Sequence, residues 1–210
     1  SNPDMKPGVM SYNSAMNAWA KSGHSDAGVK AEKLLREMQA QASSNPDMKP
    51  DVTSYTSAID AWAKSGHSDA GLKAEKLLRE MQAQASSNPD MKPNVLSYNS
   101  AMNGWAKSGH SDAALKAEKL LREMQAQASS NPDMKPNVLS YNSAMNGWAK
   151  SGHSDAALKA EKLLREMQRQ ASSNPDMKPN VLSYNSAIDA WAKSGHSDAG
   201  LKAEKLLREM

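Results

Sequence analysis

The tetrapeptide Gly-His-Ser-Asp occurs five times in the chain and brings together the three residue types of a hydrolytic triad. Its histidines are His24, His67, His110, His153 and His196. A triad requires the three side chains to converge in space, and residues adjacent on one tight turn rarely reach that geometry. One histidine per turn also supplies too few ligands for a metal ion, and the chain has no cysteine. We therefore expect no catalytic residues, no metal site and no cofactor.

Two other positions carry polar side chains that vary while their surroundings stay almost constant. The first holds asparagine or threonine, as Asn13, Thr56, Asn99, Asn142 and Asn185. The second holds aspartate or asparagine, as Asp51, Asn94, Asn137 and Asn180. A carboxylate only accepts hydrogen bonds, whereas an amide offers two donors and an acceptor. The pair can therefore distinguish ligands by hydrogen-bonding pattern, although the same residue types are also ordinary helix-capping residues.

A lysine recurs with the same period, as Lys21, Lys64, Lys107, Lys150 and Lys193. A single lysine of this kind is usually part of a solvated face, but five in one phase of a stacked array would form a basic stripe able to contact phosphates. The net charge of +3 is small, so charge alone does not indicate a nucleic-acid or membrane partner.

The overall composition would by itself favour disorder, because the mean hydropathy is −0.74 and low hydrophobicity is typical of unfolded chains. Five Trp and five Tyr at fixed spacing argue against that interpretation. No apolar run approaches the roughly 20 residues that cross a bilayer, and no secretory or transit segment is present in this chain.

These residues are positioned by a tandem repeat. The string Ser-Asn-Pro-Asp-Met-Lys-Pro begins at Ser1, Ser44, Ser87, Ser130 and Ser173, so every interval is 43 residues. Identity this close indicates recent duplication or a designed, consensus-derived sequence. We interpret residues 1–210 as a single array, with units at 1–43, 44–86, 87–129, 130–172 and a shortened 173–210.

Each unit predicts two helices, which we describe for the third unit. The first should run from about Val95 to Lys107, with Asn94 as its N-cap and Gly109 in the left-handed conformation that ends a helix. Its apolar residues recur at helical spacing: they are Val95, Tyr98, Ala101, Met102, Trp105 and Ala106.

The second helix should follow at once, capped by Ser111, with Asp112 in its first turn, where a carboxylate suits the helix dipole. It should reach about Ala128, and 129–136 should connect to the next unit. Neither helix can bury its apolar stripe alone, so neighbouring units must stack. We therefore predict an all-α, right-handed α-solenoid of five helix-turn-helix repeats, with Tyr and Trp in its core.

The unit resembles the pentatricopeptide repeat (PPR) rather than the tetratricopeptide repeat, in which Trp precedes Tyr. The PPR motif runs from Val-x-Thr-Tyr-Asn through Lys-x-Gly and Glu-Met to Lys-Pro-Asp. The matching residues are Val95-Leu96-Ser97-Tyr98-Asn99, Gly104, Lys107-Ser108-Gly109, Asp112-Ala113-Ala114, Glu123-Met124 and Met134-Lys135-Pro136-Asn137. The resemblance recurs in all five units, although a unit of 43 residues is longer than is usual in the family.

The resemblance implies binding of single-stranded RNA, one base per repeat, read by the fifth residue of a unit counted from its Val and by the last residue before the next Val. Those are the two variable positions above. Asn13 with Asp51 would read uracil, and Thr56 with Asn94 would read adenine. The two pairs Asn99–Asn137 and Asn142–Asn180 would take pyrimidines, with cytosine preferred, and Asn185 would be a fifth, unpaired position. The implied core target is 5′-U-A-Y-Y-3′.

The resemblance assigns roles to two further sets of residues. The second residue of each unit would sandwich a base between neighbouring units, and these residues are Met10, Thr53, Leu96, Leu139 and Leu182. The recurrent lysines would contact phosphates. Stacking contributes about 1–3 kcal/mol per base against an association cost on the order of 4–15 kcal/mol, so we expect roughly micromolar affinity.

The alternative function is a helical repeat scaffold, designed or consensus-derived, or a protein–protein interaction module without nucleic-acid binding. A pure scaffold gives no reason for Asn/Thr and Asp/Asn to vary at the two positions. Terminal units that lack polar caps lead us to expect end-to-end self-association. The resemblance implies a mitochondrial or plastid setting, although no residue in the chain carries that address.

Overall fold

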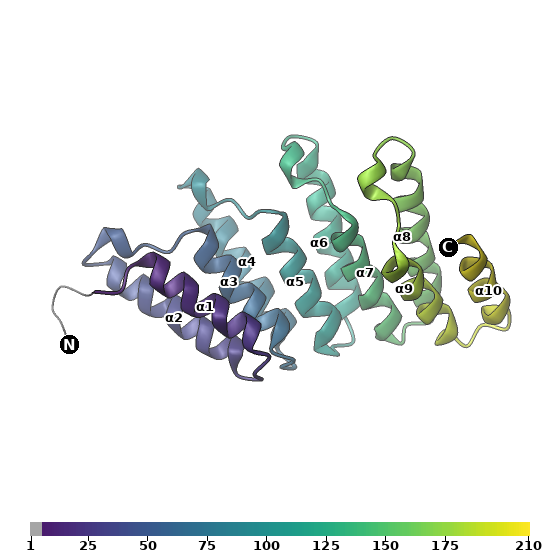
Figure 1. The fold of residues 1–210 in the computed structure, drawn as a ribbon, viewed down its shortest axis with the longest axis horizontal. Helices are drawn as coiled ribbons and strands as arrows, with labels where there is room; N and C mark the ends of the chain where they lie inside the picture. Colours follow the sequence, from purple (N-terminus) through teal and green to yellow (C-terminus); the bar gives the residue numbers. More distant parts are fainter. Residues whose placement is uncertain (1–5) are drawn as a thin grey trace. The chain divides into compact units, whose positions relative to one another are not determined.

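The computed structural model describes residues 6–210, which form ten α-helices and four 3-10 helices, with no strand in that range (Figure 1). The α-helices are α1 (Val9–Ser22), α2 (Ala27–Ala42), α3 (Val52–Lys64), α4 (Ala70–Ala85), α5 (Val95–Ser108), α6 (Ala113–Ala128), α7 (Val138–Ser151), α8 (Ala156–Ala171), α9 (Val181–Ala192) and α10 (Ala199–Glu209). The prediction of an all-α fold built from repeated helix pairs is confirmed. The chain separates into two compact units, Ser1–Gly104 and Trp105–Met210, each described below by itself.

The first helix of a repeat begins and ends where the sequence predicts. Asn137 caps α7: its side-chain oxygen accepts a hydrogen bond from the backbone N–H of Ser140 at 3.1 Å, and the Ser140 hydroxyl accepts one from the Asn137 backbone N–H at 3.1 Å. Two of the otherwise unpaired amides at the helix start are thereby satisfied. Gly152 ends α7 with φ of 68°, a left-handed conformation that costs glycine little.

The start of the second helix differs from the prediction. Ser111 does not cap α6, because the helix begins at Ala113 and the residue before it is Asp112, whose side chain makes no capping hydrogen bond. The reason is that the turn satisfies the first amide through its own backbone: the Ala113 N–H donates to the His110 carbonyl at 3.1 Å. With that donor occupied, no serine cap is required.

The connection between repeats has structure that the sequence interpretation missed. Within the stretch predicted as a plain connection, Pro132–Met134 forms a 3-10 helix, and the Asn131 side chain accepts a hydrogen bond from the Asp133 N–H at 3.2 Å. Met134 is only 3% exposed. The loop is therefore fastened to the helix pair by one buried side chain, and proline at the start of the 3-10 turn was the available signal.

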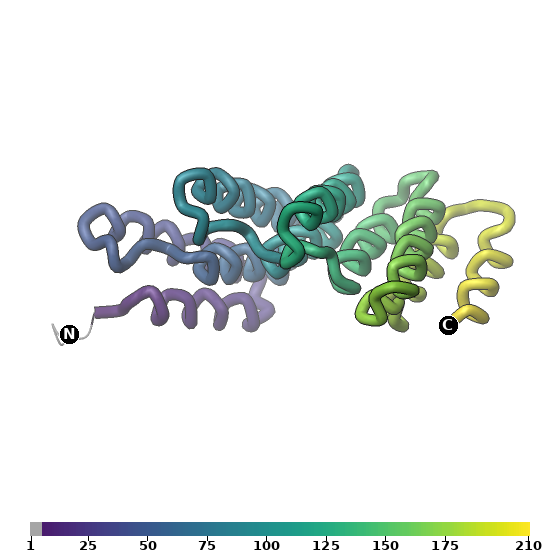
Figure 2. Tube along the Cα trace, turned by 90° about the horizontal axis from the view of Figure 1, so that it is seen from above, coloured from purple at the N-terminus to yellow at the C-terminus, as the bar shows by residue number. Residues whose placement is uncertain are grey.

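Packing follows the same pattern in both units. In the first, α3 packs against α1, α2 and α4, and in the second, α7 packs against α6, α8 and α9; Figure 2 shows α1 and α3 side by side from a second direction. The predicted aromatic core is confirmed: Tyr55 and Tyr141 have no exposed surface, and Trp62 and Trp148 are 3% and 1% exposed. Side chains this large supply much of the buried apolar area in each repeat.

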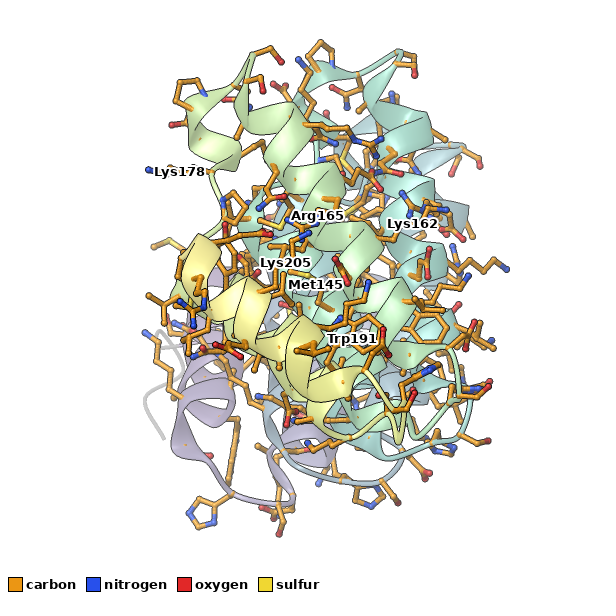
Figure 3. All side chains as sticks on the ribbon, turned by 90° about the vertical axis from the view of Figure 1, so that its right-hand side faces the viewer. Met145, Lys162, Arg165, Lys178, Trp191 and Lys205 are labelled. Atoms are coloured by element: carbon orange, nitrogen blue, oxygen red, sulfur yellow. The ribbon has the colours of Figure 1, made fainter. Side chains whose placement is uncertain are left out.

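Within each of the two units, polar contacts join neighbouring repeats. The indole N–H of Trp62 donates to Glu32 Oε2 at 2.9 Å, and Arg36 donates to both carboxylate oxygens of Glu80 at 2.7 and 2.9 Å. In the second unit, Arg165 of α8, labelled in Figure 3, pairs in the same way with Glu209 of α10. This pair holds the pKa of the Glu209 carboxyl below its ordinary value. Bidentate pairs of this kind fix geometry as well as adding stability.

None of the helices in residues 6–210 is long and apolar enough to span a membrane.

Two glycines of the last repeat give a matched test of these backbone assignments. Gly195 has φ of +69°, Gly200 lies in α10, and an added Cβ would meet no atom within 4 Å at either position. Gly195→Ala should lower the free energy of unfolding by about 1–2 kcal/mol, the cost of a left-handed alanine. Gly200→Ala should leave it unchanged or raise it by up to about 1 kcal/mol through helix propensity. Thermal unfolding followed by circular dichroism measures both, and shifts of equal sign would contradict the assignment.

Candidate functional site

The two variable positions of the first repeat are joined by hydrogen bonds. Asn13, on α1, donates from Nδ2 to Oδ1 of Asp51, the N-cap of α3, at 3.2 Å. The hydroxyl of Ser54 donates to Asn13 Oδ1 at 2.7 Å and lies 2.9 Å from Asp51 Oδ1. We call this arrangement of fifth residue, cap residue and serine the junction. It brings together two side chains that are 38 residues apart in the sequence.

The second unit contains the same junction with an amide in place of the carboxylate. Asn142 Nδ2 donates to Asn180 Oδ1 at 3.3 Å, and the Ser183 hydroxyl donates to Asn142 Oδ1 at 2.7 Å. Asn180 is at the same time the N-cap of α9, because its Oδ1 accepts from the Ser183 N–H at 3.1 Å. Aspartate and asparagine therefore occupy the cap position with the same geometry.

Threonine changes the junction of the second repeat. Thr56 Oγ1 lies 2.9 Å from the hydroxyl of Ser97, which donates to Asn94 Oδ1 at 3.0 Å. The shorter side chain reaches the cap residue only through the serine. The fifth position therefore sets how the cap side chain is held, which gives the Asn/Thr variation a direct structural effect.

Burial divides the work within each junction. The fifth residues Thr56, Asn99 and Asn142 are 6%, 4% and 4% exposed, whereas the cap residues Asp51 and Asn180 are exposed. The buried fifth residue orients the side chain of the cap residue. The exposed cap side chain then presents its second polar atom to solvent. That atom is Oδ2, an acceptor, in aspartate and Nδ2, a donor, in asparagine.

The remaining members of the two predicted sets are placed as follows. Asn94 caps α5, its Oδ1 accepting from the Ser97 N–H at 2.9 Å. Asn137 caps α7, and Asn185 is exposed on α9. The serine of the junction was missed by the sequence interpretation, although its recurrence as the third residue of every unit was the signal. The sequence lists it as Ser11, Ser54, Ser97, Ser140 and Ser183.

A groove of about 390 Å³ runs between the first helices of the first unit. The fifth residues Asn13 and Thr56, the cap residue Asn94 and the second residues Thr53 and Leu96 line it together. Hydrogen-bonding groups and an apolar side chain thus face the same space, as a site for a flat, polar-edged ligand requires.

The second residues of the units are exposed although four of the five are large and apolar. Thr53 is exposed as well. The exposed fractions of the apolar members are 84% for Met10, 56% for Leu96, 51% for Leu139 and 55% for Leu182. A second periodic set, on the second helices, is equally exposed: Val29, Leu72, Leu115, Leu158 and Leu201. Exposure alone therefore does not distinguish the second residues, and their place beside the polar groups of the groove does.

The five recurrent lysines are all exposed but are not equivalent. Lys64 Nζ lies 2.7 Å from Asp60 Oδ2, and Lys193 Nζ lies 2.7 Å from Asp189 Oδ2. Within residues 6–210, Lys21, Lys107 and Lys150 form no ion pair. Of the five lysines that were predicted to form a basic stripe, two are therefore paired with an aspartate and three are not.

The histidines of the Gly-His-Ser-Asp turns pack edge-on against the tryptophan of their own repeat, with ring centroids 5.8 Å apart for His153 and Trp148. His153 Nε2 also lies 2.9 Å from the Ser111 carbonyl oxygen. Their contacts are those of a packed turn that bridges two repeats.

Parts of the sequence match family models, and the fold is similar to that of solved structures. A family model described as "PPR repeat" matches residues 96–127, and one described as "Pentatricopeptide repeat domain" matches residues 119–194. The crystal structure of the pentatricopeptide repeat protein PPR10 from maize has a TM-score of 0.67 and 23% identity, over 99% of this chain and 25% of that one. A structure of PPR10 in complex with an 18-nt psaJ RNA element has a TM-score of 0.40 and 19% identity, over 98% and 35% of the two chains. No curated protein matches the sequence.

The helix pairs, the junction and the matched motifs define a helical repeat protein with a recurring surface site. The two family models together cover residues 96–194, and the units outside that span repeat the same sequence with few changes. The chain belongs to the pentatricopeptide repeat family, as its motifs indicate. It spans about a quarter of the length of the maize protein, and that likeness shows the fold alone.

Replacing the junction serine by alanine tests how much it contributes to the stability of the fold. Ser183 has no exposed surface, and Ser183→Ala leaves Asn142 Oδ1 and the Asn180 N–H without their hydrogen-bond partner. The free energy of unfolding should fall by about 1–2 kcal/mol. The matched control is Ser173→Ala, an exposed serine that donates only to the Gln170 carbonyl, where the change should stay within about 0.5 kcal/mol. Equal melting temperatures for the two variants would show that the junction contributes nothing to folding.

Proposed function

We propose that the chain binds single-stranded RNA along its first helices, one base per repeat, without catalysing a reaction. The observation that carries this proposal is the junction, which is formed in the first and fourth repeats and, with threonine, in the second. It presents one selectable hydrogen-bonding atom beside an exposed second residue of the unit. A modular reader of unpaired bases needs that combination: a polar atom for the base edge and an apolar surface for its face. Membership of the family supports the same function.

Base selection follows from the outward atom of the cap residue. In the first repeat, Asp51 Oδ1 accepts from the Ser54 N–H at 2.8 Å and from Asn13 Nδ2 at 3.2 Å. Oδ2 has one longer contact, with Asn13 Nδ2 at 3.5 Å, so it is the oxygen with more capacity to accept from a base donor. Uracil offers such a donor at N3. In the fourth repeat, Asn180 Oδ1 accepts from Ser183 and Asn142, which leaves the Nδ2 donors for an acceptor such as cytosine N3.

The remaining repeats complete the target. Thr56 with Asn94 reads adenine and Asn99 with Asn137 reads a pyrimidine, as the family resemblance implies, so the core is 5′-U-A-Y-Y-3′. Asn185 stands at a fifth, pyrimidine-tolerant position. Met10, Thr53, Leu96, Leu139 and Leu182 sandwich the bases, and Thr53 is the weakest surface of the five because it is the smallest and least apolar.

The direct test is fluorescence anisotropy with a short labelled RNA that contains UACC. We expect roughly micromolar binding, because a few stacked bases leave little free energy after the cost of association. An RNA with purines in place of the pyrimidines and the DNA of the same sequence serve as controls, and both should bind more weakly. Absence of binding to all three at tens of micromolar would contradict the proposal and favour a repeat scaffold or protein-interaction module.

The variant Asp51→Asn separates base reading from folding. Asparagine already caps α7 and α9 with the same hydrogen bonds, so the melting temperature should hardly change. The outward atom becomes a donor, so the ratio of affinities for UACC and CACC should shift toward cytosine by about tenfold, which corresponds to about 1.4 kcal/mol. Asn180→Asp is the reciprocal variant and should shift the fourth base toward uracil. An unchanged ratio in both variants would remove the cap residue from base selection.

A further inference from the structure

The residue four positions before each recurrent lysine differs between repeats. It is asparagine in three repeats, as Asn17, Asn103 and Asn146, and aspartate in two, as Asp60 and Asp189. Residues four apart on a helix lie on the same face, so this position decides which neighbour the lysine has. The first, third and fourth repeats carry a neutral amide there, and the second and fifth carry a carboxylate.

In the second repeat the carboxylate is held in place from two sides. Asp60 Oδ2 accepts from Lys64 Nζ at 2.7 Å, and Asp60 Oδ1 lies 3.4 Å from the Ser100 hydroxyl. The Asp60 side chain is 23% exposed and lines the same groove as Thr56 and Asn17. Asp60 therefore borders the space assigned to the RNA.

A pair this close acts on a ligand more than on the fold. Ion pairs four residues apart on an exposed helix contribute only about 0.3–0.5 kcal/mol to stability. Toward a phosphate farther away, however, the positive and negative charges largely cancel, and only a lysine with uncompensated charge releases a counterion when it binds a phosphate. A lysine paired with aspartate therefore contributes little to the salt-dependent part of RNA affinity.

We propose that Asp60 and Asp189 are specificity-tuning residues that cancel the charge of Lys64 and Lys193, so that the RNA backbone is held by Lys21, Lys107 and Lys150 alone. The inference rests on the proposed function, because it assigns the phosphate contacts of that same site. It means that the second nucleotide is held by its base alone and that the fifth has no phosphate contact from Lys193, whereas the first, third and fourth are held by base and phosphate together.

The experiment measures the slope of log K against log salt concentration for a labelled RNA containing UACCC. Each phosphate neutralised in a single strand contributes about −0.7 to the slope. Three active lysines give about −2, and five give about −3.5. The parent chain should therefore lose about 20-fold in affinity between about 50 and 200 mM salt, and the double variant Asp60→Asn/Asp189→Asn about 130-fold.

Matched variants of the same chain add carboxylates instead of removing them and should therefore make the slope less steep. Asn17→Asp/Asn146→Asp places the carboxylate in two more repeats and should reduce the slope to about −0.7. Lys150→Met should reduce the parent slope by about 0.7, whereas Lys64→Met should leave it almost unchanged. Asparagine and aspartate both occur at this position within the chain, so the circular dichroism spectra of the asparagine and aspartate variants should match that of the parent.

The outcomes separate the inference from the function on which it rests. A parent slope near −2 that steepens in Asp60→Asn/Asp189→Asn and flattens in Asn17→Asp/Asn146→Asp supports the inference. Parent binding with the same slope in every variant, or equal losses for Lys64→Met and Lys150→Met, overturns the inference and leaves RNA binding intact. No binding of the parent to RNA overturns both.

Discussion

The candidate site depends on the capping of α3 and of α9 by a side chain that is also bonded to the first helix of the preceding repeat. Asp51 accepts from the Ser54 N–H at the start of α3 and from Asn13 Nδ2 on α1. A helix start has amides that need an acceptor, and one oxygen supplies it while fixing the position of α1 beside α3. Local folding, packing between repeats and the orientation of the exposed polar atom are thus consequences of one set of hydrogen bonds.

Much of the fold could be predicted because it depends on local rules. The spacing of Tyr98 and Trp105, the cap at Asn94 and the left-handed Gly109 placed the predicted end of α5 at Lys107, one residue before its observed end at Ser108. The cap predicted at Ser111 was wrong because a backbone hydrogen bond within the turn takes the amide that the serine would have served. The capping preference of serine considers only the side-chain hydroxyl as an acceptor. It does not take into account a backbone carbonyl that can accept from the same amide.

The candidate site was predictable in identity but not in arrangement. The two variable positions and the lysines follow from periodicity and resemblance, whereas the burial of Asn142 beneath the exposed Asn180 depends on residues 38 apart. The contacts of Arg36 with Glu80 and of Trp62 with Glu32 also join different repeats. Helical spacing within one repeat does not predict these contacts, because it does not tell which helix faces of neighbouring repeats pack against each other. The pairing of Lys64 with Asp60 could have been inferred, since the two lie four residues apart on one helix.

The interchange of aspartate and asparagine at the cap position has an evolutionary consequence. Both residues satisfy the same helix amide, so a single-step change at this codon alters the chemistry offered to solvent without passing through a destabilised intermediate. Most mutations at functional positions are constrained by a loss of stability. Here the exchange of aspartate and asparagine keeps the helix cap and therefore leaves stability almost unchanged. Each repeat can thus change the hydrogen-bonding group that it presents independently of its neighbours. A lineage that duplicates such units acquires new surfaces by copying first and diversifying afterwards.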